Sequence, residues 1–243
     1  MHLSLLYPAV LLILTRWLRR DVFCKMKDKL KIVIFDLDGT LVDAYQGVAS
    51  SLNYALAQLN GAPIDDLRIK RSVGWGDRHL IATFVGEEDV DKALSIFRQH
   101  HARALKEGTV FLPGAKQLLS KLKAEKYTLA VASNRPSRFT HIILKHLRLQ
   151  QAFDHVLCAD KVAQPKPAPD ILEKILKKFS LTADEALYVG DMTVDVEAGN
   201  RAGIKTVAVV TGSSTKSELA SLKPFKIIDQ VSQVAQIVDN LNI

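Results

Sequence analysis

The sequence predicts an α/β fold: a parallel sheet with helices on both faces, and an all-helical segment inserted after the first strand. From residue 112 onward, short apolar runs alternate with amphipathic helical patterns, which is typical of parallel sheets with right-handed crossovers. Residues 44–111 show helical periodicity and no convincing strand. The first strand is followed at once by acidic residues, at the place where an open parallel sheet binds its ligands.

The first strand comprises Ile32–Phe35, an unbroken apolar run of the kind found in fully buried parallel strands. Asp36 and Asp38 follow it, and on extended chain their carboxylates point the same way, so they repel unless a cation lies between them. Gly39 lets the backbone turn sharply and direct N–H groups toward an anion. The alternative for this stretch is a strand that ends in a solvated acidic turn.

The inserted segment contains four predicted helices. Apolar residues recur at helical spacing, and Asn60-Gly61 is a good C-terminal signal for the first helix. Asp77 can cap the third helix. The expected helices run over about residues 48–59, from 63–66, from Asp77, and over 90–108. Because the insert follows directly on a strand that carries two carboxylates, we interpret it as a lid.

After the insert, strands and helices alternate. The expected strands are 128–132, 155–158, 186–189 and 206–210, with 227–228 as a small edge strand. The expected helices are 113–126, 137–149, 170–179 and 194–202, and residues 213–222 and 231–241 complete the surface. This order predicts a Rossmann-like sheet.

Composition narrows the class of protein. The 243 residues are 48% apolar with a formal charge of +7, which suits one α/β domain with an insert. The positive excess lacks basic clusters, and this argues against nucleic-acid binding. Cys24 and Cys158 have no paired spacing, so neither a disulfide framework nor a zinc site is expected. We therefore expect a cytoplasmic protein with no nucleic-acid or membrane partner.

Residues 1–25 are expected to lie outside the fold. Leu3–Leu14 is largely apolar, but a bilayer-spanning helix needs about 20 such residues. The charges follow this run, whereas a secretory signal carries them before it. A start at Met26 would lead directly into the first strand, and a weak membrane-surface anchor is the alternative. The predicted division is an extension at 1–25, a core at 26–43 and 112–243, and an insert at 44–111.

Five polar residues lie at or just beyond predicted strand ends: Asp36, Asp38, Ser133, Lys166 and Asp191. Because the carboxyl ends of parallel strands meet at one edge of the sheet, these side chains should surround a single point. Ligation by oxygen alone suits octahedral Mg²⁺. Taken singly, each residue has another role open to it. Ser133 and Asp191 could cap the helices that follow them, and Lys166 could be an exposed loop lysine.

Four motifs stand in order: FDLDGTLVD at 35–43, VASN at 131–134, Lys166 in KPAPDI, and GDMTVDVEAG at 190–199. Together they resemble the haloacid dehalogenase superfamily of phosphotransferases, and specifically its phosphoglycolate phosphatase-like branch. The resemblance spans residues 31–212, nearly the whole chain after Met26. Four ordered motifs are far more specific than one short pattern.

The resemblance implies a role for each residue. Asp36 would be the nucleophile that forms an aspartyl phosphate, and Asp38 the acid for the leaving alcohol and later the base for water. Asp36, Asp191 and the main-chain carbonyl of Asp38 would hold Mg²⁺, and Lys166 would add positive charge. Asp195 is expected to order water or Lys166. The implied phosphate-binding residues are Gly39, Thr40, Ser133, Asn134 and Lys166.

Asp38 also excludes some reactions. Dehalogenases of this superfamily lack an acid at that place, and the phosphonate-cleaving branch resembles Asp-x-Ala there. The expected substrate is therefore the phosphate ester of a small metabolite, 2-phosphoglycolate by default, bound beneath a helical cap formed by residues 44–111. The candidate specificity residues in the cap are Gly74-Trp75-Gly76 together with Arg71, Arg78 or His79. Trp75 equally suits a role in hinge or cap packing.

Other functions fit the same core. A sugar-phosphate mutase would return the phosphoryl group to a bound intermediate, and a pyrophosphatase would hydrolyse pyrophosphate. The non-enzymatic alternative is a regulatory or binding module on an inactive scaffold. Such a module is expected to lack Asp36, Asp38 or Lys166, and all three are present.

Overall fold

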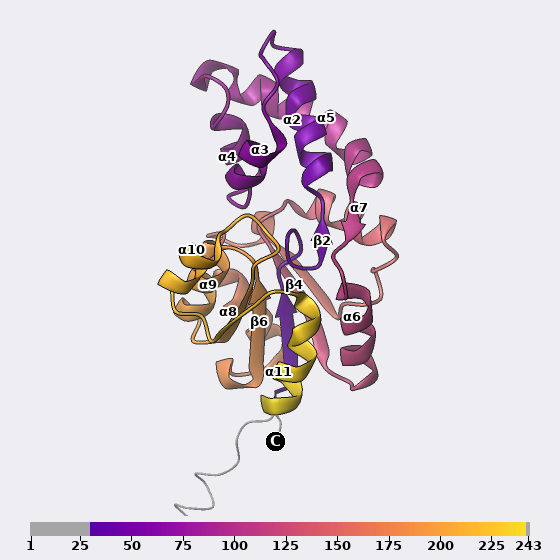
Figure 1. The fold of residues 1–243 in the computed structure, drawn as a ribbon, viewed down its shortest axis with the longest axis vertical. Coiled ribbons are helices and arrows are strands. Elements are labelled where there is room, and N and C mark those ends of the chain that lie inside the picture. Colours follow the sequence, from indigo (N-terminus) through magenta and orange to yellow (C-terminus); the bar gives the residue numbers. More distant parts are fainter. Residues whose placement is uncertain (1–29, 242–243) are drawn as a thin grey trace, which may run out of the picture.

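The computed structural model describes residues 30–241 and contains a six-stranded parallel sheet in the order β5-β4-β1-β6-β7-β8 (Figure 1). Its strands are β1 (Ile32–Phe35), β4 (Thr128–Ser133), β5 (His155–Cys158), β6 (Ala186–Gly190), β7 (Lys205–Val209) and β8 (Lys226–Ile228). The helices around it are α6 (Ala115–Ala124), α7 (Ser137–His146), α8 (Asp170–Phe179), α9 (Thr193–Arg201), α10 (Lys216–Ser221) and α11 (Val234–Leu241). The predicted α/β fold is confirmed.

Side chains of β1 alternate between the two faces of the sheet. Val33 and Phe35 pack with α6, α7 and α11, whereas Ile32 and Ile34 pack with α8 and α9. All four side chains are fully buried, which is why this strand carries no polar residue. Burial of such apolar surface, worth about 25 cal/mol per Å², is the main force that holds helices to both faces.

The register of β1 determines where the functional groups lie. Phe35 pairs with Val131 of β4 on one side and with Val189 of β6 on the other. The chain therefore leaves the three central strands at nearly the same level. The polar side chains at or just beyond these strand ends are those of Asp36, Ser133 and Asp191.

Residues 44–111, called the helical insert below, contain α2 (Tyr45–Ala57), α3 (Asp66–Ser72), α4 (Asp77–Ala82) and α5 (Val90–Gly108). The insert has an apolar cluster of its own, in which α2 packs along α5 through Leu52, Leu56, Leu94 and Phe97. Figure 1 shows the insert beyond the carboxyl end of β1. A separate cluster explains why helical periodicity is strong in this segment.

Two details of the insert differ from the prediction. Val42–Asp43 (β2) and Val110–Phe111 (β3) pair antiparallel and join the insert to the core; strands of two residues are too short to produce a period. Asp77 does not cap α4, because Gly76 takes the N-cap position. Asp77 lies in the first turn instead, where it accepts two hydrogen bonds from Arg98.

The predictions about residues 1–25 and a start at Met26 lie outside the described residues. Between residues 30 and 241 the structure contains no helix that is both long and apolar enough to span a membrane.

Candidate active site

A buried lysine stands at the centre of the sheet edge. Lys166, in the loop between β5 and α8, is 2% exposed, so it is not the exposed loop lysine that the sequence left open. Its Nζ donates to Asp36 Oδ1 at 2.6 Å and to Asp195 Oδ1 at 2.7 Å. The Ala132 carbonyl at 2.8 Å and Tyr188 Oη at 3.0 Å complete its surroundings. Since an ammonium has three N–H donors, this one is fully used.

The main chain of Lys166 is held by Asn134. The Oδ1 of Asn134 accepts from Lys166 N at 3.0 Å, and its Nδ2 donates to Lys166 O at 2.9 Å. The same Nδ2 donates to the carbonyl of Gly74 in the helical insert, also at 2.9 Å. The side chain of Asn134 therefore positions Lys166, where a contact to phosphate was predicted.

The carboxylates around Lys166 carry more negative charge than it balances. Burial raises the pKa of Asp36 to about 7, against the attraction of Lys166, and the charge of Asp195 adds to the rise. Burial alone would lower the pKa of Lys166, but Asp195 and Asp36 outweigh it and raise that pKa. Burial, followed by the charges of Asp36 and Asp195, raises the pKa of Asp191 well above its usual value. This excess of negative charge favours a bound cation.

Two carboxylates at the start of α9 have different partners. Asp195 Oδ2 accepts from the main-chain N–H groups of Met192 at 2.9 Å and Asp191 at 3.2 Å. Met192 is the N-cap residue of α9, and Asp195, at the third helical position, binds back to it as in a capping box. Asp191, for which a capping role had been open, accepts instead from Thr40 Oγ1 at 2.9 Å and Ser213 N at 3.3 Å. Asp195 thus accepts hydrogen bonds both from the start of α9 and from the buried Lys166.

Asp36, Asp191 and Asp195 form a group whose donors fit a hard divalent cation. Each offers one carboxylate oxygen, and these three atoms lie within 4.8 Å of one another. Each oxygen of Asp195 already accepts two hydrogen bonds. Each oxygen of Asp191 accepts one, and Asp36 accepts one on Oδ1, so Asp36 and Asp191 are the better placed for direct ligation. Oxygen donors of this kind suit Mg²⁺.

Buried hydroxyl groups beside Asp191 support the same fit. Tyr45 Oη and Ser213 Oγ have no hydrogen-bond partner among residues 30–241. A Cβ added to Gly39 would lie 2.5 Å from both Tyr45 Oη and Asp191 Oδ2, so this hydroxyl and this carboxylate face one small space. An unpaired buried hydroxyl costs free energy. Water on a cation held by Asp191 would supply the missing partners.

Two residues predicted to bind phosphate are engaged within the protein. Gly39 N donates to Val42 O at 2.8 Å and closes the turn after β1; its φ of +79° is one that glycine adopts readily. Thr40 Oγ1 donates to Asp191 and is fully buried. Thr40 therefore orients a carboxylate of the cluster.

Ser133 lines the cavity at the end of β4 and is 2% exposed. Its Oγ accepts from Arg135 N at 3.2 Å. It does not cap α7, whose N-cap is Pro136. Because Oγ accepts this bond, its own O–H remains able to donate to a phosphoryl oxygen.

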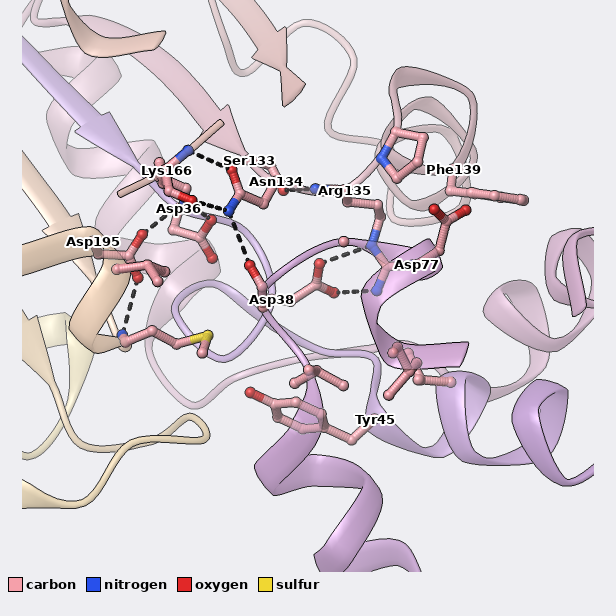
Figure 2. A pocket seen from close by; sticks show the side chains of 18 of the residues that line it. Asp36, Asp38, Tyr45, Asp77, Ser133, Asn134, Arg135, Phe139, Lys166 and Asp195 are labelled. Atoms are coloured by element: carbon pink, nitrogen blue, oxygen red, sulfur yellow. Dashed lines mark hydrogen bonds and ion pairs between the residues drawn. The ribbon is translucent and has the colours of Figure 1, made fainter. Parts of the chain in front are cut away.

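Asp38 directs its carboxylate to Arg135, a residue that the sequence analysis missed. Figure 2 shows the pair: Arg135 Nε donates to Oδ2 at 2.8 Å and Nη2 to Oδ1 at 2.9 Å. Bidentate arginine–carboxylate pairs are among the stronger polar contacts in proteins. Its position in the sequence could have identified it as a site residue, because Arg135 follows directly on Ser133-Asn134 at a strand end.

The other side of Arg135 is held by His101 from α5. Arg135 Nη1 lies 2.7 Å from His101 Nε2, and since arginine can only donate, Nε2 accepts. The Nδ1–H of His101 then donates to Ser51 Oγ at 2.9 Å, which donates to Gly47 O at 2.8 Å. Burial, and then the charge of Arg135, lowers the pKa of His101 to about 2. The His101 side chain is 1% exposed.

A cavity between the core and the helical insert contains these groups. Its core side includes Asp36, Asp38, Ser133, Arg135, Lys166 and Asp195, and its insert side includes Val48, Val73, Leu80 and Phe97. Of the candidate specificity residues, Gly74 and Gly76 line it, whereas Trp75, Arg71, Arg78 and His79 do not. Trp75 is 48% exposed, and Arg78 pairs with Asp91.

Direct contacts hold the insert over the cavity. Arg71 of α3 donates to Ser213 O at 2.6 Å and to both carboxylate oxygens of Glu218. Lys70 Nζ donates to Thr211 O at 3.3 Å. These contacts join α3 to the loop after β7 and to α10. The same loop supplies an N–H group to Asp191.

Known proteins resemble this chain in sequence and in fold. The model of the haloacid dehalogenase-like hydrolase family matches residues 33–209. A phosphoglycolate phosphatase of Rhodospirillum rubrum is 34% identical over 215 residues, which cover 84% of this chain and 89% of that protein. One from Aquifex aeolicus is 29% identical, with 87% and 98% covered.

Among solved structures, a predicted phosphoglycolate phosphatase from Haemophilus somnus 129pt has a TM-score of 0.81 at 26% identity, with 86% of this chain and 97% of that chain covered. The family match includes β4, β6, all of β1 but Ile32, and the polar residues at the ends of these strands. On its sequence and its fold, this chain belongs to the haloacid dehalogenase-like hydrolase family.

Proposed function

We propose that this hydrolase is a Mg²⁺-dependent phosphatase of a small phosphorylated metabolite, with 2-phosphoglycolate as the first substrate to test. The observation that carries the proposal is the meeting of Asp36, Asp191 and Lys166 at the carboxyl edge of the sheet. A carboxylate nucleophile lies there beside two sources of positive charge, an ammonium and a cation site. The names of the relatives in Rhodospirillum rubrum and Aquifex aeolicus support this substrate class.

Asp36 is the proposed nucleophile. Lys166 holds one of its oxygens at 2.6 Å, and the residue lines the cavity. Attack on phosphorus would form an aspartyl phosphate as the alcohol leaves. The hold on one oxygen orients the carboxylate, and orientation contributes much of the rate in phosphoryl transfer. Water then releases phosphate and restores Asp36.

Asp38 is the proposed acid and base. Arg135 holds both of its oxygens, and an ion-paired carboxylate has no proton to donate. The contact must therefore loosen when Asp38 protonates the leaving alcohol. It can form again when the ionised carboxylate accepts a proton from water.

Charge on the phosphoryl group would be balanced from several sides. Asp36, Asp191 and the main-chain carbonyl of Asp38 would hold Mg²⁺, which neutralises charge on the transferred group. Lys166 remains protonated because its pKa is raised. Ser133 would donate its hydroxyl to a phosphoryl oxygen.

The helical insert, residues 44–111, is proposed as a cap on a core formed by residues 30–43 and 112–241. Its apolar side chains line the cavity opposite the catalytic groups. Exclusion of water by such a surface strengthens the electrostatic contacts within the site. The contacts of Arg71 with the core would hold the cap closed and release it to admit substrate.

Phosphate release from a panel of esters tests the proposal. The panel contains 2-phosphoglycolate, a hexose phosphate, pyrophosphate and nitrophenyl phosphate. We expect release with Mg²⁺ and loss of activity with a chelator. Isomerisation of the hexose phosphate without release would indicate a mutase, and a preference for pyrophosphate would indicate a pyrophosphatase. Full turnover in metal-free buffer would contradict the role of the cation.

A further inference from the structure

We propose that Arg135 forms a subsite for a carboxylate on the leaving group, so that the enzyme selects phosphorylated hydroxy acids over neutral phosphate esters. The inference rests on the proposed phosphatase function and names the residue that recognises the substrate class. It follows from the unused donors of Arg135, from the lining of the cavity, and from the contact between Arg135 and Asp38.

The buried guanidinium of Arg135 has N–H donors that are not used in hydrogen bonds to the described residues. A guanidinium carries five N–H donors. Two bind Asp38 and one binds His101, which leaves one on Nη1 and one on Nη2 without an acceptor among residues 30–241. The side chain is 11% exposed and lines the cavity. Two donors on neighbouring nitrogens can bind a carboxylate through two hydrogen bonds.

Among residues 30–241, no other cation that lines the cavity is available to a second anionic group. Lys166 has its three N–H donors committed to protein acceptors. The insert side of the cavity is largely apolar, and Asp77, which also lines it, is an anion paired with Arg98. A carboxylate on the leaving group could therefore find a positive partner only in Arg135.

The contact with Asp38 places Arg135 where a leaving group must lie. An acid that protonates the leaving oxygen must be within hydrogen-bond reach of it. Arg135 binds that acid at 2.8 and 2.9 Å, so the atoms next to the leaving oxygen lie beside the guanidinium. A carboxylate one carbon away from this oxygen, as in 2-phosphoglycolate, would reach Nη1 and Nη2.

His101 orients Arg135 without cancelling its charge. Its Nε2 accepts from Nη1 at 2.7 Å as a neutral imidazole. The His101 ring is itself fixed between Phe97, stacked at 4.5 Å between centroids, and Phe139, edge-on at 4.9 Å. An acidic residue at this place would have neutralised the guanidinium, whereas a neutral acceptor leaves it able to attract an anion.

The kinetic test compares 2-phosphoglycolate with 2-hydroxyethyl phosphate, in which a neutral CH₂OH group replaces the carboxylate. We expect wild type to prefer 2-phosphoglycolate in kcat/KM. Arg135→Gln should lower this preference by about 10- to 100-fold, the range for a hydrogen bond between charged groups. Both esters need Asp38 as the acid, so any effect of the substitution on Asp38 lowers both kcat/KM values alike. The ratio of the two kcat/KM values is therefore free of that effect.

Two further variants sharpen the comparison. Arg135→Lys keeps the charge but not the paired donors, so it should retain part of the preference. Arg138→Gln is the matched control, because Arg138 is exposed on α7 and does not line the cavity; its preference should equal that of wild type. Equal efficiency of wild type on the two esters would overturn the subsite, as would an unchanged preference in Arg135→Gln. If Arg135→Gln does not fold, Arg135→Lys and the wild-type ratio decide.

Binding separates this inference from the proposed function. Calorimetry on Asp36→Asn, with and without Arg135→Gln, measures the affinity of both esters without turnover. The subsite predicts tighter binding of 2-phosphoglycolate and loss of this difference with Arg135→Gln. Equal affinities would refute it. Failure of wild type to hydrolyse either ester, with the difference in affinity intact, would reject the phosphatase and leave the carboxylate subsite standing.

Discussion

Lys166 donates a 2.6 Å hydrogen bond to Asp36 across 130 residues of sequence, and both side chains are buried at the edge of the sheet. Asp191 and Asp195 share this small volume, so one ammonium faces three carboxylates. Like charges that are buried together raise each other's pKa and oppose folding when ionised. The free energy of unfolding should therefore depend on pH and on metal in a linked way.

We expect Mg²⁺ to raise the melting temperature more at about pH 7.5 than at about pH 5. The pKa of Asp36 is raised from 3.8 to about 7 without metal, so the folded state binds more protons than the unfolded state between these values. The contribution of Asp36 to stability is present below about pH 4 and is lost as the pH rises through about 7. Mg²⁺ replaces the proton, so its effect grows over this window. Melting curves with Mg²⁺ and with chelator at both pH values measure it.

Asp36→Asn is the control for that experiment, because it removes the titrating carboxylate and keeps its shape. Its metal-free melting temperature should fall less between the two pH values than that of wild type. An equal Mg²⁺ effect at both pH values in wild type would show that protons and metal do not compete at this cluster.

Tyr45→Phe should weaken Mg²⁺ binding by about 2- to 10-fold, the range for one hydrogen bond. Tyr45 Oη is buried beside Asp191 and has no partner within residues 30–241. Since the hydroxyl makes no bond in the metal-free protein, its removal should leave metal-free stability unchanged or higher. Calorimetric titration with Mg²⁺ and urea denaturation provide the two readouts. Tyr54→Phe is the control, because Tyr54 is 44% exposed on the same helix. Lower stability with unchanged affinity would mean that Tyr45 serves packing alone.

Substitutions of Asp36 and Asp38 should block the reaction at different steps. Asp36→Asn should form no phosphoenzyme and lose on the order of 10³-fold or more in turnover. Asp38→Asn keeps the nucleophile, and nitrophenyl phosphate needs little help in leaving. With that ester, Asp38→Asn should phosphorylate Asp36 and then stall before hydrolysis. Rapid quench and intact-mass measurement detect the added group, and finding it on Asp36→Asn would reverse the assignment.

Arg71→Ala should raise KM several-fold, whereas Arg78→Ala should leave it unchanged. Arg71 joins α3 to Ser213 and Glu218 of the core, but Arg78 pairs only within the helical insert, with Asp91. Exposed ion pairs contribute little to stability, about 0–1 kcal/mol, so both variants should melt close to wild type. Hydrogen exchange in α3 should rise only in Arg71→Ala. Matching KM values would indicate that these contacts do not hold the cap.

The fold and the meeting of Asp36, Lys166 and Asp191 could be predicted from local patterns. Each long strand has an apolar run of its own, and parallel strands end at one edge, so the position of a residue just after a strand is known without coordinates. The two-residue strands β2 and β3 escaped prediction because they are too short to show a period. The role of Asp191 at α9 was likewise open, since a carboxylate at that position suits a helix start.

The parallel sheet, the inserted helices and the edge at which the acids and Lys166 meet can be predicted from the residue order, because periodicity and strand order are properties of the chain. The pairing of Asp38 with Arg135, and the contact of Arg135 with His101, depend on how the folded elements pack. These partners come from the loop between β4 and α7, from α5 and from the turn after β1, and they meet because α5 packs against α7. A hydrogen bond between side chains depends on such packing to within a fraction of an ångström, and no spacing along the chain encodes it.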